Sequence, residues 1–119
     1  MLTIYGIKNC NTMKKAFDFL NDKGVAYEFF DYKKSVLPKA DFDKFVVLFG
    51  DKVINKQGTT YRKFDDDTKA VLMSDDTFAI YEIIKDNQSV LKRPMVMGEY
   101  QGKEVALIGF GDEWEQVLA

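Results

Sequence analysis

The single cysteine of this chain, Cys10, stands where a predicted first strand gives way to a predicted first helix. Backbone N–H groups at the start of a helix have no intrahelical partner, and the helix dipole is positive there. Both effects favour a thiolate over a thiol, and the thiolate is the nucleophilic form of cysteine. Cys10 is therefore the position at which the sequence predicts chemistry.

The residues available to assist Cys10 are few. The chain has no histidine, which excludes Cys-His catalysis, Ser-His-Asp triads and imidazole metal sites. Met13 lies three positions after Cys10 and Ala16 lies six positions after it, so neither a Cys-x-x-Cys pair nor a Cys-x5-Arg loop is present. Only two of the 17 basic residues are arginines, Arg62 and Arg93. A guanidinium offers a planar fork of donors that lysine lacks, which makes these two residues candidates for specific roles.

The composition fits one globular domain without a membrane segment. The 119 residues are 46% hydrophobic and 14% aromatic, which is enough for a core. A net charge of −2 provides no basic field, so direct nucleic-acid binding is not expected. No apolar run approaches the roughly 20 residues that span a bilayer, and no signal-peptide pattern is present. A lone thiol fits a reducing compartment, so we expect a cytoplasmic protein with no membrane partner.

The first part of the chain predicts a strand–helix–strand unit. Residues 2–5 form a short apolar run, and residues 11–23 carry apolar side chains at helical spacing before Gly24, a good helix stop. Residues 25–31 are aromatic and alternating, which is typical of a second strand. A helical connection of this kind predicts two parallel strands joined by a right-handed crossover.

The middle of the chain predicts helices. Pro38 can begin a helix that Gly50 ends, with an apolar stripe between them. Residues 55–63 are interpreted as a loop. Asp65, Asp66 and Asp67 favour a helix start, because acidic groups stabilise the positive end of the dipole; they lack the spacing of a calcium loop. Ser74 is a candidate N-cap for a further helix through about residue 86.

The last part of the chain predicts a hairpin and a terminal helix. Residues 95–97 and 104–108 are short apolar runs, and residues 99–102 between them suit a turn. Residues 109–111, with two glycines, interrupt the second strand, and residues 112–118 form a short helix. The predicted order is β-α-β, then helices, then β-β-α.

This order resembles the thioredoxin fold, an α/β fold with a mixed four-stranded sheet. Five blocks narrow the match: Tyr5–Ala16 with Cys10, Asp31–Lys34, Asn55–Lys63, Leu91–Pro94 and Ile108–Phe110. Together they resemble the arsenate reductase family that works with glutathione and glutaredoxin, especially its short thiol-reductase branch related to Spx. The resemblance implies one thioredoxin-like domain with its core in residues 1–34 and 88–119 and a helical insertion at about 35–87.

The family resemblance also implies roles for particular residues. Its nucleophile matches Cys10, and the arginines that hold an oxyanion or keep the thiolate ionised match Arg62 and Arg93. Pro94 matches the family's cis proline, which packs against the reactive cysteine. Beside them, donors for glutathione carboxylates or an oxyanion are expected from Lys8, Asn9, Asn11 and Thr12. No bound cofactor or metal is implied; glutathione or another low-molecular-weight thiol would be the co-substrate, with glutaredoxin a candidate partner.

The sequence differs from the family pattern at two points, and each difference argues against one possible function. Arsenate reductases proper carry a further arginine after the proline strand, and none follows Arg93 here, which weakens the case for arsenate as substrate. Redox switching of the Spx kind needs a second cysteine, which is absent. A monothiol reductase is the leading hypothesis. The alternative is a non-enzymatic Spx-like regulator that binds RNA polymerase or another protein.

Several of these residues could also have purely structural roles. Most lone cysteines are small buried hydrophobes, and Cys10 could be one of them. Asn11 is fully explained as a helix cap. Lys14 and Lys15 are expected on a solvated helix face.

Overall fold

The computed structural model describes residues 1–118. The chain divides into two compact units: the first contains Met1–Tyr32 and Arg93–Ala119, and the second contains Lys33–Lys92. No helix among the described residues is long and apolar enough to cross a lipid bilayer.

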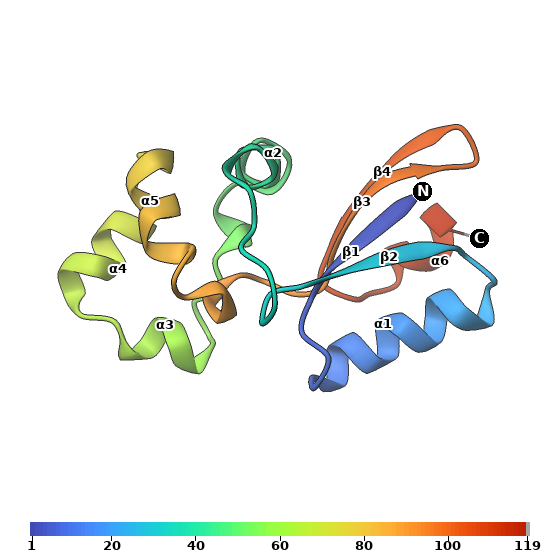
Figure 1. The fold of residues 1–119 in the computed structure, drawn as a ribbon, viewed down its shortest axis with the longest axis horizontal. Helices are drawn as coiled ribbons and strands as arrows, with labels where there is room; N and C mark the ends of the chain where they lie inside the picture. The colour runs from blue at the N-terminus through green and yellow to red at the C-terminus, as the bar shows by residue number, and fades with distance from the viewer. Residues whose placement is uncertain (119) are drawn as a thin grey trace. The chain divides into compact units, whose positions relative to one another are not determined.

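The first unit contains the sheet (Figure 1). Its elements are β1 (Leu2–Gly6), α1 (Asn11–Asp22), β2 (Tyr27–Asp31), β3 (Met95–Tyr100), β4 (Lys103–Ile108) and α6 (Glu113–Leu118). Within the described residues, four strands form one mixed sheet in the order β2-β1-β3-β4. Strand β1 is parallel to β2 and antiparallel to β3, and β3 is antiparallel to β4. The α/β fold with a mixed four-stranded sheet is as predicted from the sequence.

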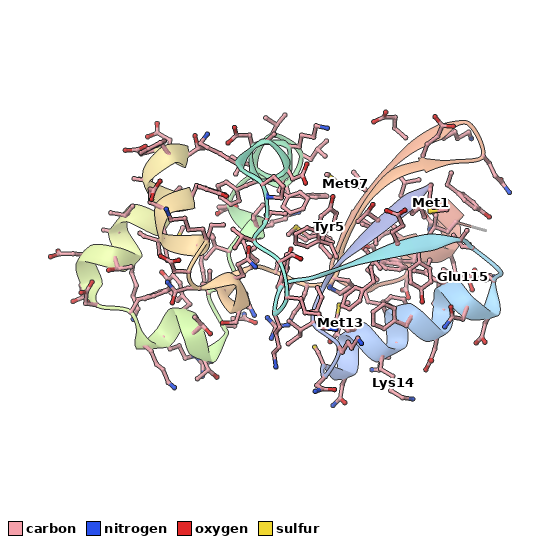
Figure 2. The ribbon with its side chains drawn as sticks, in the orientation of Figure 1. Met1, Tyr5, Met13, Lys14, Met97 and Glu115 are labelled. Atoms are coloured by element: carbon pink, nitrogen blue, oxygen red, sulfur yellow. The ribbon has the colours of Figure 1, made fainter. Side chains whose placement is uncertain are left out.

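The core of the first unit lies between one face of the sheet and the helices α1 and α6. Alternate residues of each strand face this layer; Ile4 pairs with Val96, which pairs in turn with Leu107. From α1 the buried side chains are Met13, Ala16 and Leu20, at the spacing of one helix face. Met13 points from the first turns of α1 toward the sheet (Figure 2). Helix α6 adds Trp114 and Leu118. Burying α1 in this way fixes the position of its first residue relative to the sheet.

The second unit is helical. Its elements are α2 (Lys39–Phe49), the 3-10 helix η1 (Gly50–Val53), α3 (Thr59–Lys63), α4 (Asp66–Leu72), α5 (Thr77–Ile84) and the 3-10 helix η2 (Gln88–Val90). The buried Gln88 side chain ties the start of the unit to its end: its amide oxygen accepts from the Leu37 N–H at 2.6 Å, and its amide nitrogen donates to the Ser35 carbonyl at 2.8 Å. The Tyr81 hydroxyl donates to the Leu37 carbonyl at 2.7 Å.

Two predictions for this unit are wrong. Residues 55–63 are not all loop, because α3 forms within them after the N-cap residue Gly58. A helix of five residues is too short to show an apolar period in the sequence. Ser74 does not cap α5; Asp76 does, accepting from the Ala79 N–H at 3.1 Å. The Ser74 hydroxyl instead donates to the Val71 carbonyl.

The turns and the other helix starts agree with the sequence. Asp65 caps α4 by accepting from the Thr68 N–H at 2.7 Å. Pro38 is the N-cap of α2, and Gly50 is its C-cap. The β3–β4 hairpin turns through Gln101 and Gly102, both with positive φ. Two positive φ angles in a two-residue turn match the twist of the flanking strands.

Gly98 in β3 has no room for a side chain. Its φ is +138°, and a Cβ there would collide with the Met1 carbonyl oxygen. We expect Gly98→Ala to lower the free energy of unfolding by about 2 kcal/mol or more. Alanine rarely adopts this φ, and its Cβ would overlap the Met1 carbonyl oxygen. Urea denaturation followed by circular dichroism measures this. Glu99→Ala, at an exposed position of the same strand, is the control, and equal stability of the two variants would contradict the prediction.

Candidate functional site

Cys10 is the N-cap residue of α1. Its backbone is extended, with φ −145° and ψ 132°, and its carbonyl accepts the first helical hydrogen bond, from the Lys14 N–H at 2.9 Å. The side chain makes no short capping hydrogen bond, but the N–H groups of Met13 and Thr12 face the sulfur closely enough to stabilise its charged form. The residue is partly exposed and packs against the edge of the core. The position of the thiol is therefore fixed by packing, while solvent and small molecules can still contact it.

The environment of Cys10 favours the thiolate. Burial has the largest single effect and raises the pKa of the thiol, because it removes water from the charged form. The opposing effects outweigh it: the Met13 N–H, the Arg93 side chain as a hydrogen-bond donor, the Thr12 N–H and the Arg93 charge together lower the pKa of Cys10 below its ordinary value. The helix start and one guanidinium therefore favour the thiolate without a proton acceptor beside it.

Arg93 reaches Cys10 because of strand pairing. Tyr5 pairs with Met95, so the residues after β1 and those before β3 meet at one end of the sheet. The Arg93–Pro94 peptide bond is cis, as the resemblance implied, and the Pro94 carbonyl accepts from the Gly109 N–H at 2.8 Å.

Gly6 permits the close packing at this end of the sheet. A Cβ on Gly6 would collide with the Met13 sulfur and touch the Arg93 Cβ. The absence of a side chain at Gly6 therefore lets α1 and the segment before β3 approach the end of β1 together.

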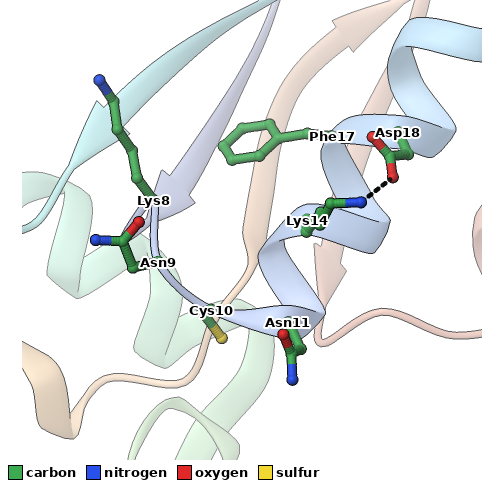
Figure 3. A pocket seen from close by; sticks show the side chains of 7 residues that line it. All are labelled: Lys8, Asn9, Cys10, Asn11, Lys14, Phe17 and Asp18. Carbon is green, nitrogen blue, oxygen red and sulfur yellow. Dashed lines mark hydrogen bonds and ion pairs between the residues drawn. The ribbon is translucent and has the colours of Figure 1, made fainter.

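A pocket open to solvent lies beside the thiol (Figure 3). It is lined by residues of the β1–α1 loop and the first two turns of α1: Lys8, Asn9, Cys10, Asn11, Lys14, Phe17 and Asp18. The Phe17 ring packs against two aromatic rings of β2. Its centroid lies 5.1 Å from that of Phe29 in an edge-on contact and 5.8 Å from that of Tyr27 in a stacked contact. The pocket therefore combines a fixed aromatic wall with amide and ammonium groups.

The structure brings most of the predicted site residues into the first unit. Lys8, Asn9 and Asn11 line the pocket with Cys10, and Thr12 contributes its N–H to the thiolate. The interpretation of Asn11 as the helix cap is wrong, because Cys10 occupies that position; the side chain of Asn11 is exposed and available to a ligand.

Arg62 is the predicted site residue that belongs to the second unit. It lies in the last turn of α3. Its role beside the thiolate stays a prediction.

Sequence reasoning missed three residues of the pocket: Lys14, Phe17 and Asp18. The sequence places Lys14 on a solvated helix face, and Phe17 is one of the apolar side chains at helical spacing within residues 11–23. Residues 10, 14, 17 and 18 follow the spacing of one helix face, which places them in line with the nucleophile. This spacing in the sequence could have predicted that Lys14, Phe17 and Asp18 lie near Cys10.

A match to one protein family covers nearly the whole chain. The sequence model of the ArsC family matches residues 5–118. The chain belongs to the ArsC family. The match begins within β1 and ends in α6, so it includes β2, β3, β4, the Cys10 loop and the Arg93–Pro94 segment.

The relatives carry different descriptions. A Haemophilus influenzae protein described as uncharacterized is 37% identical over 114 residues, covering 95% of this chain and 94% of its own. The global transcriptional regulator Spx of Staphylococcus saprophyticus is 26% identical, covering 83% of this chain and 75% of its own. Spx relatives thus match at lower identity over a smaller share of the chain.

The solved structures agree on the fold. The YFFB protein is 36% identical, covers all of both chains and has a TM-score of 0.85. An arsenate reductase (ArsC) related protein from Brucella melitensis is 38% identical, covering 97% of this chain and 91% of its own, with a TM-score of 0.66. The thioredoxin-like assignment made from the sequence is confirmed.

Arg93 should control the ionisation of Cys10. We expect Arg93→Gln to raise the midpoint of the pH profile of iodoacetamide alkylation, because it removes both the hydrogen bond and the positive charge that favour the thiolate. Arg93→Lys should raise it less, since the charge is kept. Lys103→Gln, which removes a charge from the β4 end of the hairpin, is the control. A midpoint in Arg93→Gln equal to that of the unchanged protein would contradict this assignment.

Proposed function

We propose that this protein is a monothiol oxidoreductase in which Cys10 is the nucleophile and glutathione, or another low-molecular-weight thiol, is the reductant. The observation that supports it is the thiol itself: Cys10 lies at the start of α1, its pKa is lowered by backbone N–H groups and Arg93, and it borders an open pocket. A buried structural cysteine needs none of these features.

The proposed cycle has two exchange steps. The Cys10 thiolate attacks one sulfur of a disulfide, forming a mixed disulfide and releasing the other sulfur as a thiolate. The Cys10 sulfur is oxidised, and the departing sulfur takes the electron pair. A second thiolate then attacks the mixed disulfide, forms a disulfide with the bound group and restores the Cys10 thiolate. The chain has no other cysteine, so this second thiolate must come from another molecule.

The other site residues would bind the co-substrate. Asn9, Asn11 and the loop N–H groups offer donors to its carboxylates, and Lys8 offers a positive charge. Pro94 would lie against the bound thiol, and Arg62 would take the family's second anion-binding role. Glutaredoxin would be the partner protein that recycles the mixed disulfide, in a reducing cytoplasmic compartment.

Arsenate is a weaker proposal than disulfide exchange. The related structure from Brucella melitensis is described as arsenate reductase related, but no arginine follows Arg93 in this chain. Binding a tetrahedral oxyanion would then depend on Arg62, Arg93 and backbone donors alone.

Incubation with glutathione disulfide tests the proposed function directly. We expect intact-mass spectrometry to find one added glutathionyl group, removed by excess reduced glutathione, because the thiolate is accessible and exchange is reversible. Cys10→Ser should show no adduct. An unmodified wild-type protein after incubation at neutral pH, with Cys10 shown to be reduced beforehand, would contradict the function.

The similarity to Spx supports one alternative, a regulator that binds RNA polymerase without catalysis. If it is correct, the tagged protein should retain stoichiometric polymerase from lysate, and Cys10→Ser should retain it equally well, since the contact would not use the thiol. Quantitative mass spectrometry of the captured proteins measures this. Capture no greater than that of an unrelated tagged control protein would exclude the alternative.

A further inference from the structure

The pocket beside Cys10 is positively charged in a chain that is negative overall. Its charged lining residues are Lys8, Lys14 and Asp18, and Arg93 adds a further cation at the thiol. With the Cys10 thiolate counted, three cations and two anions lie at the pocket and its thiol, a local net charge of +1, whereas the whole chain has a net charge of −2. The local excess of positive charge is a property of this pocket.

Lys14 is poorly neutralised by its neighbour. Its ammonium lies 3.5 Å from an Asp18 oxygen, and the two side chains remain 78% and 60% exposed (Figure 3). An exposed pair of this kind is weak, and the order with the cation first is the less favourable one on a helix. The ammonium of Lys14 can therefore attract a second anion in the pocket.

The start of α1 adds to the same field. Its first turn holds no acidic residue, although acidic groups stabilise the positive end of a helix dipole. Lys14, one turn into the helix, adds positive charge to that end instead. The negative charge at this end of the helix is that of the Cys10 thiolate itself, and without further acidic groups the positive field beside it remains available to a negatively charged reactant.

We propose that the Lys14–Asp18 pair determines the charge of the disulfide that Cys10 accepts, with Lys14 attracting anionic disulfides and Asp18 limiting that attraction. This inference rests on the proposed exchange at Cys10 and adds its substrate class: small disulfides with a carboxylate within reach of Lys14. The reaction is the first exchange step described above. The pair acts on the approach of the disulfide and not on the electron transfer.

Three short disulfides of similar length test the inference: dithiodipropionate, which is anionic, hydroxyethyl disulfide, which is neutral, and cystamine, which is cationic. The rate of mixed-disulfide formation is measured by mass spectrometry at low salt for wild type, Lys14→Glu, Asp18→Asn and Lys15→Glu. Lys15 is exposed on the same helix but does not line the pocket, so Lys15→Glu makes the same charge change away from the site.

Lys14→Glu and Asp18→Asn should change the rates of mixed-disulfide formation in opposite directions. Lys14→Glu should slow mixed-disulfide formation with dithiodipropionate by about threefold and accelerate it with cystamine by a similar factor, as expected for a reversed charge in a solvent-exposed pocket. Asp18→Asn should accelerate the reaction with dithiodipropionate and slow the reaction with cystamine. Hydroxyethyl disulfide should react alike with all variants, and 0.5 M salt should remove the differences through screening.

The outcomes separate this inference from the proposed function. Rapid exchange with all three disulfides, but equal effects of Lys14→Glu and Lys15→Glu, would overturn the role of the pair while leaving Cys10 as a nucleophile. Exchange no faster than that of the urea-unfolded protein would overturn both. A loss of rate in Lys14→Glu that is equal for all three disulfides would mean a structural role for Lys14 and would also overturn the inference.

Discussion

The antiparallel pairing of β1 with β3 brings together two segments from opposite ends of the chain, and the site depends on it. Tyr5 lies opposite Met95, so the loop that carries Cys10 and the segment that carries Arg93 leave the sheet at the same end. Apolar residues on alternate positions fix this register, because a slip by one residue would turn the buried face toward water. The contact between the thiol and the guanidinium is thus a consequence of core formation.

This arrangement replaces an acid–base partner with fixed charge. A histidine can take the proton from a cysteine and return it, whereas Arg93 and the N–H groups of Thr12 and Met13 only stabilise the ion that remains. Such a site suits thiol exchange, in which sulfur leaves as an anion and no proton has to be delivered. It suits hydrolysis poorly, because a leaving amine or alkoxide needs a proton.

The sequence predicted most of what local rules decide. Cys10, the helix after it, a hairpin turn within residues 99–102 and a helix start at Asp65–Asp67 all follow from side-chain type and position. The turn is shorter than predicted, because Glu99 and Tyr100 belong to β3. The cis bond at Pro94 followed from the family resemblance, because the residues alone do not distinguish the two isomers. Helix α3 was missed because it is too short to show a period, and Ser74 was mistaken for a cap because Asp76 competes for the same position within two residues.

The pocket was the least predictable part of the site. Lys14 and Asp18 look like an ordinary solvated helix pair in the sequence, and their position beside the thiol depends on how the β1–α1 loop turns. Arg62 remains a prediction from the family.

Met13 links the stability of the protein to its reactivity. Its side chain is buried in the core and fills the space that Gly6 leaves open, while its N–H stabilises the Cys10 thiolate. A substitution at Met13 that moves the backbone in order to repack the core would also move the amide beside the sulfur. Packing at positions 6 and 13 therefore bears on two things at once, the fit of α1 against the sheet and the ionisation of the thiol at its start.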